Sequence, residues 1–220
     1  MTLTRREFAF AVSTTALLAA AGFSPLGLIR AANAQDVNAA ELAKPVPLGD
    51  VVLGNPNSPV TLIEYASMSC GHCAEFHRTI YPKLKADYID TDKIRFIFRE
   101  FPLDIKAAAG AMLARCVGKD DPKKYHAVVD LLFATQNDWV LKDTSEQLRK
   151  LSKQTGMSDE AFTACLSNQS MLDAIKQGQD QAYEKFKVDS TPTFFINGTR
   201  LKGGASYDDF KKLIDPNLKS

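Results

Sequence analysis

Four consecutive residues, Cys70-Gly71-His72-Cys73, carry the clearest chemical signal in this 220-residue chain. They form a C-x-x-C motif between an apolar segment at 60–66, which predicts a buried β-strand, and residues 74–88, which predict a helix. A C-x-x-C that closes a strand and opens a helix is placed for redox chemistry. The helix N-terminus favours negative charge, so we expect a stabilised thiolate at Cys70.

The motif by itself leaves two other interpretations open, half of a zinc site and a structural disulfide. A zinc site needs four ligands. Outside the motif the sequence offers Cys116, Cys165 and isolated histidines, and it has no second C-x-x-C. The metal interpretation is therefore weak, and we expect that the protein needs neither a metal ion nor an organic cofactor.

A second motif, Thr191-Pro192, lies far downstream. Residues 193–196 have strand composition, Asn197-Gly198 is a hairpin turn signal, and residues 199–202 can form the return strand. Proline at a strand entrance fits an edge or a bulge, and a cis peptide bond there would be a specific structural device. Taken alone, the Thr-Pro pair also fits an ordinary strand-entry turn.

Together these motifs resemble the DsbA-like thiol:disulfide oxidoreductases, which have a thioredoxin fold. The similarity covers roughly residues 46–213 and includes further matching positions: Ile63, Glu64, Tyr65, Phe76, Pro82 and the run 99–103. The resemblance implies an α/β fold, namely a thioredoxin fold with a helical domain inserted between the βαβ unit and the C-terminal ββα unit.

The resemblance also assigns roles at the motif. Cys70 would be the exposed reacting sulfur and Cys73 its buried partner. The imidazole of His72 would support the Cys70 thiolate, and Glu64 would be the acid beneath the disulfide, with Arg99 as its expected partner.

Three further positions follow from the same resemblance. Thr191 and Pro192 would face the disulfide through a cis bond and offer backbone groups to an extended substrate strand. Gly71 and Glu64 would tune the redox strength. Gly71 stands where the best-known family member has proline, and Thr191 is shared with isomerase-type relatives.

The segments between the motifs predict the domain organisation. Residues 35–47 are expected to be a linker, residues 48–104 and 188–220 the thioredoxin-like domain, and residues 105–187 the helical insert. An edge strand is expected at 49–54 and a strand parallel to the first at 94–99. The predicted helices are 71–88 with a kink at Pro82, 106–117, 122–135, 144–155 capped by Thr144, 158–166 capped by Ser158, 171–186, and 206–214 stopped by Pro216.

The first 34 residues predict an export signal that is cleaved after Ala34. Arg5-Arg6 precede a moderately apolar run, and Ala32-Asn33-Ala34 forms an A-x-A site. The twin arginine favours a Tat-type signal, and a Sec signal or an uncleaved anchor are the alternatives. The mature chain would then be a nearly neutral periplasmic monomer, without the basic block that nucleic acid requires.

Cys116 and Cys165 fall on two different predicted helices of the insert. A disulfide between them is expected to have a structural or tuning role, and two free buried thiols are the alternative. Among the histidines, His77 is expected to be solvated or capping and His126 structural. Trp139 is expected to pack against the insert.

The leading functional hypothesis is a periplasmic dithiol oxidase that donates its Cys70–Cys73 disulfide to unfolded or newly exported cysteine-containing proteins. The resemblance implies re-oxidation by a membrane, quinone-linked partner of the DsbB type. A disulfide isomerase or reductase kept reduced by a membrane electron donor is the alternative within the same chemistry. A binding or chaperone module with a structural C-x-x-C is the alternative from another class.

Overall fold

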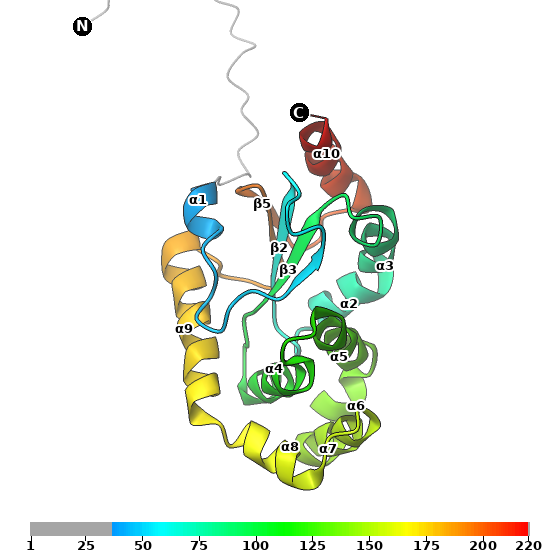
Figure 1. Cartoon of the computed structure of the whole chain (residues 1–220), viewed down its shortest axis with the longest axis vertical. Helices are drawn as coiled ribbons and strands as arrows, with labels where there is room; N and C mark the ends of the chain where they lie inside the picture. Colours follow the sequence, from blue (N-terminus) through cyan, green and yellow to red (C-terminus); the bar gives the residue numbers. More distant parts are fainter. Residues whose placement is uncertain (1–36, 220) are drawn as a thin grey trace, which may run out of the picture. The chain divides into compact units, whose positions relative to one another are not determined.

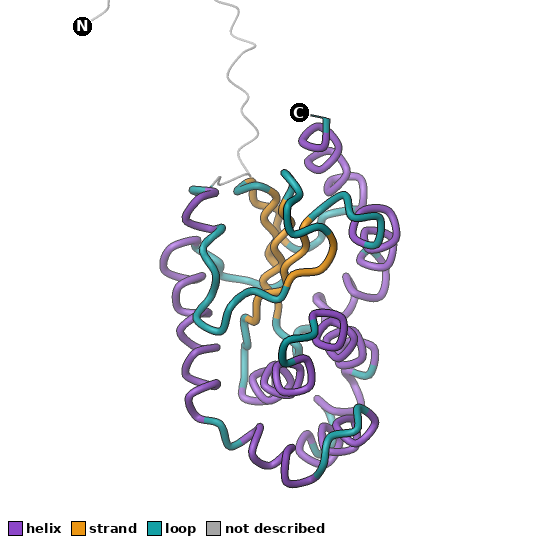
Figure 2. Tube along the Cα trace, in the orientation of Figure 1, coloured by secondary structure: helices purple, strands orange, loops and turns teal. Residues whose placement is uncertain are grey.

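The computed structural model describes residues 37–219, and the export signal expected at 1–34 lies outside them. A sheet lies at the centre of this part of the chain, with helices around it (Figure 2). It has five strands in the order β1-β3-β2-β4-β5. The strands are β1 (Val52–Gly54), β2 (Thr61–Ala66), β3 (Arg95–Glu100), β4 (Thr193–Ile196) and β5 (Thr199–Lys202). β2 and β3 pair in parallel and the other neighbours pair antiparallel, as in the predicted thioredoxin fold.

Helices cover the sheet and form the insert between β3 and β4. They are α1 (Ala39–Leu42), α2 (Gly71–Thr79), α3 (Tyr81–Leu84), α4 (Ile105–Gly118), α5 (Pro122–Ala134), α6 (Gln136–Val140), α7 (Thr144–Gln154), α8 (Asp159–Leu166), α9 (Gln169–Phe186) and α10 (Tyr207–Leu218), with a π-helical turn, η2 (Lys85–Ile89). No helix in the described range is long and apolar enough to cross a membrane. The predicted fold class, an α/β thioredoxin fold with a helical insertion, is confirmed.

The central strand β2 is buried on both faces, and its alternate residues pack against different layers of helices. Leu62 belongs to the core cluster that includes residues of α2, α3 and α10, whereas Ile63 and Tyr65 belong to the cluster formed with α1 and α9. Figure 1 shows these two groups of helices on opposite sides of the sheet. By the same alternation Glu64 points toward α2, the helix that the C-x-x-C opens.

The helix after the motif is interrupted earlier than expected. α2 ends at Thr79, and Ile80 separates it from α3, in which Pro82 occupies one of the first two positions. A proline is tolerated there because its missing N–H would have no intrahelical partner. The single kinked helix predicted for residues 71–88 is therefore two short helices followed by a π-helical turn.

Two other local expectations were wrong. Asp143, not Thr144, caps α7, because its carboxylate accepts the N–H of Glu146. Pro216 lies inside α10 and does not stop it at residue 214. A proline in the last turn removes few hydrogen bonds, and burial of Ile214 holds that turn against the core.

The segment expected as a linker is packed onto the domain. It contains α1, whose Leu42 is buried, and Asn38 caps that helix with its side chain. The N–H of Val37 donates to the carbonyl of Gly198 over 3.0 Å, which fixes the start of the described chain beside the β4–β5 turn.

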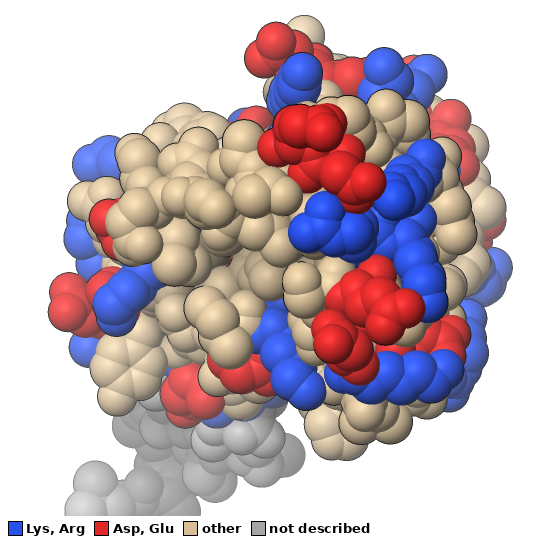
Figure 3. All heavy atoms as spheres, turned by 90° about the horizontal axis from the view of Figure 1, so that it is seen from below, with Lys and Arg blue, Asp and Glu red and all other residues tan. Residues whose placement is uncertain are grey.

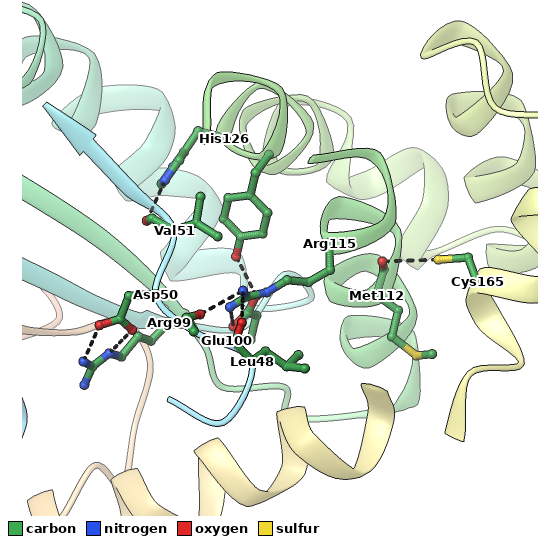
Figure 4. A network of polar contacts seen from close by, with 11 residues as sticks. Leu48, Asp50, Val51, Arg99, Glu100, Met112, Arg115, His126 and Cys165 are labelled. Carbon is green, nitrogen blue, oxygen red and sulfur yellow. Dashed lines mark hydrogen bonds and ion pairs between the residues drawn. The ribbon is translucent and has the colours of Figure 1, made fainter. Parts of the chain in front are cut away.

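Arg99 is buried, but its expected pairing with Glu64 is wrong. Its guanidinium donates to both carboxylate oxygens of Asp50, at 3.0 and 2.9 Å (Figure 4). It also donates to the hydroxyl of Tyr65 at 2.7 Å. A second buried pair, Arg115 with Glu100, lies nearby and joins α4 to the end of β3. Both arginines also donate to backbone carbonyls of the segment before β1, so this network holds that segment on the sheet.

Asp50→Asn is expected to lower the free energy of unfolding by about 3–5 kcal/mol, because it leaves the Arg99 guanidinium buried without its counter-charge. Chemical denaturation of the two proteins measures the difference. Asp138→Asn is the control, since Asp138 pairs with Lys142 at the surface, where such a pair contributes about 0.5 kcal/mol or less. Equal losses in the two variants would contradict the importance of the buried pair.

Candidate active site

Cys70 begins helix α2. It is the N-cap residue, with extended backbone (φ −78°, ψ 121°), and the structure has both Cys70 and Cys73 as free thiols. The N-cap position points the Cys70 sulfur at the unpaired N–H groups of the first turn, and no acidic residue occupies that turn. This is the placement expected from the strand–C-x-x-C–helix order.

The pKa of Cys70 is lowered to about 5. The largest cause is a hydrogen bond donated by the Cys73 thiol, and it outweighs the partial burial of Cys70, which acts in the opposite direction. Contact with Thr191 and the backbone N–H groups of Cys73 and His72 lower the pKa further. At neutral pH Cys70 is therefore a thiolate.

The pKa of Cys73 is shifted in the opposite direction. Its side chain is fully buried, and burial is the main reason that its pKa is raised far above the ordinary value, with the charge of Glu64 adding to the effect. One sulfur of the pair thus carries a stable negative charge and the other holds its proton. Cys70 is the more exposed of the two sulfurs, and its lower pKa would make it the better leaving group in a thiol–disulfide exchange.

The two residues between the cysteines are exposed. A Cβ on Gly71 would have no atom within 4 Å, so a side chain fits there without a clash. The contribution of His72 to the Cys70 thiolate comes from its backbone N–H. The predicted role of the His72 imidazole stays a prediction.

The loop before β4 lies against Cys70. The Thr191–Pro192 peptide bond is cis, and the Cys70 sulfur lies 3.3 Å from the carbonyl oxygen of Thr191. Residues 121 positions apart in the chain are thereby brought together, because β4 pairs with β2 and starts where β2 ends. The Thr-Pro loop and the C-x-x-C form one site.

Glu64 and His77 form a buried pair behind the cysteines. Both carboxylate oxygens of Glu64 lie within 3.2 Å of His77 Nε2, and both side chains are almost completely inaccessible to water. The expectation of a solvated or capping His77 was wrong. His77 follows Cys73 by four residues on α2, so the two share the face that turns toward β2.

Gln136 belongs to the site and was not identified from the sequence. Its amide donates to the carbonyls of Met68 and Cys70, at 2.9 and 3.0 Å, and so holds the turn that leads into α2. The short helix α6 that carries it was not predicted either. Its other buried residue, Trp139, packs into the insert as expected and donates to the carbonyl of Leu132.

Cys116 and Cys165 are joined by a disulfide between α4 and α8. Cys165 is buried, Cys116 is half-buried, and a cavity of about 700 Å³ opens beside them. His126, expected to be structural, is buried and contacts the carbonyl oxygen of Val51 (Figure 4). Burial lowers the pKa of His126 to about 4, so its ring is neutral.

Comparisons with known proteins place this geometry in a family. A family model described as thioredoxin matches residues 48–216. The crystal structure of alpha-DsbA1 from Wolbachia pipientis superimposes with a TM-score of 0.76 at 31% identity and covers 83% of this chain and 96% of its own. The chain belongs to the DsbA-like thioredoxin-fold family. Oxidised BdbD from Bacillus subtilis gives a TM-score of 0.68 at 26% identity, covering 80% of this chain and 97% of that one.

Curated sequences agree with this family. A Rickettsia conorii protein named for protein-disulfide oxidoreductase activity is 32% identical over 83% of this chain. Disulfide bond formation protein D of Bacillus subtilis is 29% identical and covers 83% of each chain. The chain spans about 65% of the length of the Rickettsia conorii relative.

Proposed function

We propose that this protein is a thiol:disulfide oxidoreductase that acts mainly as an oxidant of protein thiols. The observation that carries the proposal is the opposite character of the two sulfurs, a Cys70 pKa of about 5 beside a buried Cys73 whose pKa is raised. A stable Cys70 thiolate favours the reduced form, which makes the disulfide a strong oxidant. The relatives named for disulfide formation support the same direction.

The reaction is two thiol–disulfide exchanges. A substrate thiolate attacks the Cys70 sulfur, a mixed disulfide forms, and the Cys73 sulfur leaves with the bonding electron pair and takes up a proton. A second substrate thiolate then attacks the substrate sulfur of the mixed disulfide and releases Cys70 as a thiolate. The substrate loses two electrons and gains a disulfide, and the Cys70–Cys73 pair is reduced.

Unfolded proteins are the substrates that the surroundings of the site fit best. The Thr191-Pro192 loop offers backbone to an extended strand, as proposed for the family. Leu103 and Ile105 follow β3 with highly exposed side chains, and the N–H of Leu103 donates to Ser67 in the turn before Cys70. Exposed apolar side chains beside a reactive sulfur favour chains whose own apolar residues are not yet buried.

Charge is not expected to select the substrates. Figure 3 shows one face on which Lys and Arg side chains alternate with Asp and Glu, next to a broad uncharged area. The formal net charge of the whole sequence is +1. Such a surface fits many proteins and has no single-sign patch for nucleic acid on the face shown.

Export to the periplasm by a Tat-type signal belongs to the same proposal. It is supported by the twin arginine and the A-x-A site of the sequence. An oxidant must be re-oxidised after each turnover, and a membrane, quinone-linked protein of the DsbB type would supply that step. We expect the protein to act as a monomer and to use His72, Gly71 and Glu64 to tune the potential of Cys70–Cys73.

A disulfide isomerase or reductase is the second candidate, favoured by Thr191 in contact with Cys70. The two candidates differ in the redox state that they need in the cell. Thiol trapping of Cys70 and Cys73 in intact cells is expected to find the pair mainly oxidised. A mainly reduced pair would favour the isomerase or reductase instead.

The oxidised protein is expected to restore activity to a reduced, unfolded secreted enzyme by forming its disulfides. Cys70→Ser is expected to reduce that rate to the uncatalysed background, because the attacked sulfur is removed. Asp138→Asn, which changes only a surface ion pair, should leave the rate unchanged. A wild-type protein that neither oxidises thiols nor reduces disulfides would refute the proposed activity and favour a binding module.

A further inference from the structure

Three ionisable side chains form a row behind the active-site helix: Glu64 on β2, His77 on α2 and Asp130 on α5. His77 Nε2 lies 3.1 Å from a Glu64 oxygen, and its Nδ1 lies 3.5 Å from Asp130 Oδ1. The Glu64 side chain is 0% exposed and that of His77 4%, whereas that of Asp130 is 40% exposed. The row therefore leads from the buried acid to the surface.

Packing fixes the His77 ring in this row. Its centroid lies 4.1 Å from that of Phe133, in a stacked arrangement, and 4.5 Å from that of Tyr81. These ring contacts restrict the rotation of the imidazole, which keeps one nitrogen toward each carboxylate. The two carboxylates therefore meet different nitrogens of the same ring.

A cavity of about 420 Å³ opens at the Asp130 end of the row. Within residues 37–219, three buried polar atoms of its lining have no hydrogen-bond partner, namely His77 Nδ1, Asp130 Oδ1 and the Tyr81 hydroxyl. Unpaired buried polar atoms are uncommon, and several around one roomy cavity are the setting in which ordered water binds. The outer nitrogen of His77 is thus placed for contact with water.

The chemistry of the site requires a proton at Cys73. When a thiolate attacks Cys70, the Cys73 sulfur must leave, and a thiolate with a strongly raised pKa is a poor leaving group. The helix N-terminus stabilises Cys70 and does nothing for the buried sulfur. Glu64 contacts His77, which lies one helical turn after Cys73 on the same face of α2, and its charge acts on Cys73. Glu64 is therefore the acid through which a proton can arrive.

We propose that His77 supplies this proton through Glu64. As the Cys70–Cys73 bond breaks, the Nε2 proton of the His77 imidazolium passes to the Glu64 carboxylate, and Glu64 delivers a proton to the departing Cys73 sulfur. The products are a Cys73 thiol, an ionised Glu64 and a neutral imidazole whose Nδ1–H faces Asp130. When the disulfide closes, the same proton returns from Cys73 to Nε2. His77 acts on Cys73 only through Glu64. It is therefore a positioning residue, which holds the proton beside Glu64 and takes it back when the disulfide closes.

Asp130 has a separate part in this proposal. Its carboxylate favours the tautomer with hydrogen on Nδ1, and this leaves Nε2 free to give and take the proton on the Glu64 side. The arrangement follows the same logic as a carboxylate that orients a histidine base in hydrolases. The inference rests on the proposed function, because only a disulfide that opens and closes needs the proton.

The charges around His77 determine the direction of its pH dependence. Burial acts to lower its pKa, but the carboxylates of Glu64 and Asp130 outweigh burial and raise it to about 9. The titratable and charged groups that face the ring or line its cavity are Glu64 on β2, Asp130 and the neutral His126 on α5, Tyr81 on α3, Arg78 on α2 and Lys85 on η2. Closing needs the neutral ring, so the closing rate should rise with pH and level off above about 9.

The reaction of reduced protein with 5,5′-dithiobis(2-nitrobenzoate) separates the steps, because it releases the coloured thiolate twice. Cys70 releases the first when it attacks the reagent, and Cys73 releases the second when it closes the disulfide. Stopped-flow absorbance over a pH series therefore gives both rates. A wild-type protein with the first release and no second would refute the proposed function, whatever the variants do.

Three variants test His77. His77→Gln keeps a hydrogen-bonding group beside Glu64 but cannot carry the proton, so the second release at pH 9 is expected to slow about a hundredfold and to lose its levelling-off. Asp130→Asn is expected to move the midpoint of the profile to lower pH, because one carboxylate that raises the pKa of His77 is gone. Glu75→Gln, an exposed change on the same helix, should change neither release.

The first release is expected to be the same in all four proteins, since none of the three substituted residues is among the groups that lower the pKa of Cys70. A second release with the wild-type pH profile in His77→Gln would overturn the role of His77. If His77→Gln does not fold, Asp130→Asn provides the test, because the Asp130 side chain is partly exposed. A profile with an unmoved midpoint in folded Asp130→Asn would then overturn the proposal, while both releases in the wild type would leave the proposed function standing.

Discussion

Reduced protein is expected to show a thiolate titration with its midpoint near pH 5, and Cys73→Ala is expected to move that midpoint upward by about one to two pH units. The first value is the lowered pKa of Cys70. The shift follows because the hydrogen bond from the Cys73 thiol is the largest cause of the lowering, and a hydrogen bond to a charged group contributes about 1.5–3 kcal/mol. Thiolate absorbance against pH measures both.

His72→Ala tests the predicted role of the imidazole in the same titration. The substitution keeps the backbone N–H that acts on Cys70 and removes only the exposed imidazole. An upward shift as large as that of Cys73→Ala would show that the imidazole matters as much as the buried thiol. A midpoint near the free-cysteine value of about 8.5 in the wild type would contradict the thiolate mechanism itself.

The lowered pKa of Cys70 also makes the balance between the oxidised and reduced protein depend on pH. A group whose pKa is depressed by folding stabilises the folded state above its unfolded pKa and loses that contribution as pH falls through its folded pKa. For Cys70 the stabilisation of the reduced form is complete above about pH 8.5 and disappears as pH falls through about 5. The protein should therefore be a weaker oxidant in acid, which redox equilibration with glutathione at several pH values would measure.

Replacing both Cys116 and Cys165 by Ala is expected to lower the free energy of unfolding by about 3–4 kcal/mol while oxidase activity remains. The bond spans 49 residues, and a crosslink over such a loop stabilises mainly by restricting the unfolded chain. Denaturant unfolding measures the loss. We also expect mild reductant to reduce Cys70–Cys73 and leave this bond intact, because Cys165 is buried.

Wild-type protein with the second bond chemically reduced is the control for the double variant, because it lacks the crosslink but keeps the cysteine side chains. The two should have similar stability. A folded double variant without oxidase activity would show instead that the pair takes part in electron transfer. Mass mapping that finds both thiols free after aerobic purification would contradict the expected disulfide in solution.

Local patterns in the sequence were sufficient to predict much of the sheet and the composition of the site. Residues 193–202 combine β-branched or aromatic positions with an Asn-Gly turn, and the structure has β4 and β5 at the predicted bounds. The order of strand, C-x-x-C and helix likewise predicted Cys70 at a helix start. These features depend on neighbours in the chain, which is why they could be predicted.

Features set by distant contacts could not be predicted in the same way. Arg99 pairs with Asp50, and its expected partner Glu64 is held by His77 on the other side of the sheet. Side chains along β2 and β3 alternate between the two faces of the sheet, and this alternation determines which acid each basic residue can reach. The resemblance to the family carried no information about it. Gln136 had no sequence signal, because an amide that holds a turn 66 residues away is recognised only in the folded chain.

The hydrogen bond from the N–H of Val37 to the carbonyl of Gly198 has a practical consequence. Gly198 lies in the turn that follows β4, at the end of that strand away from Pro192. Residue 37 and Cys70 are therefore separated by roughly the length of β2, about 20 Å. The cysteines therefore open to the side opposite the point where the described chain begins. Protein immobilised on a bead through the amino-terminal side of Val37 would present its reactive sulfur to the solution, ready to capture unfolded chains as mixed disulfides.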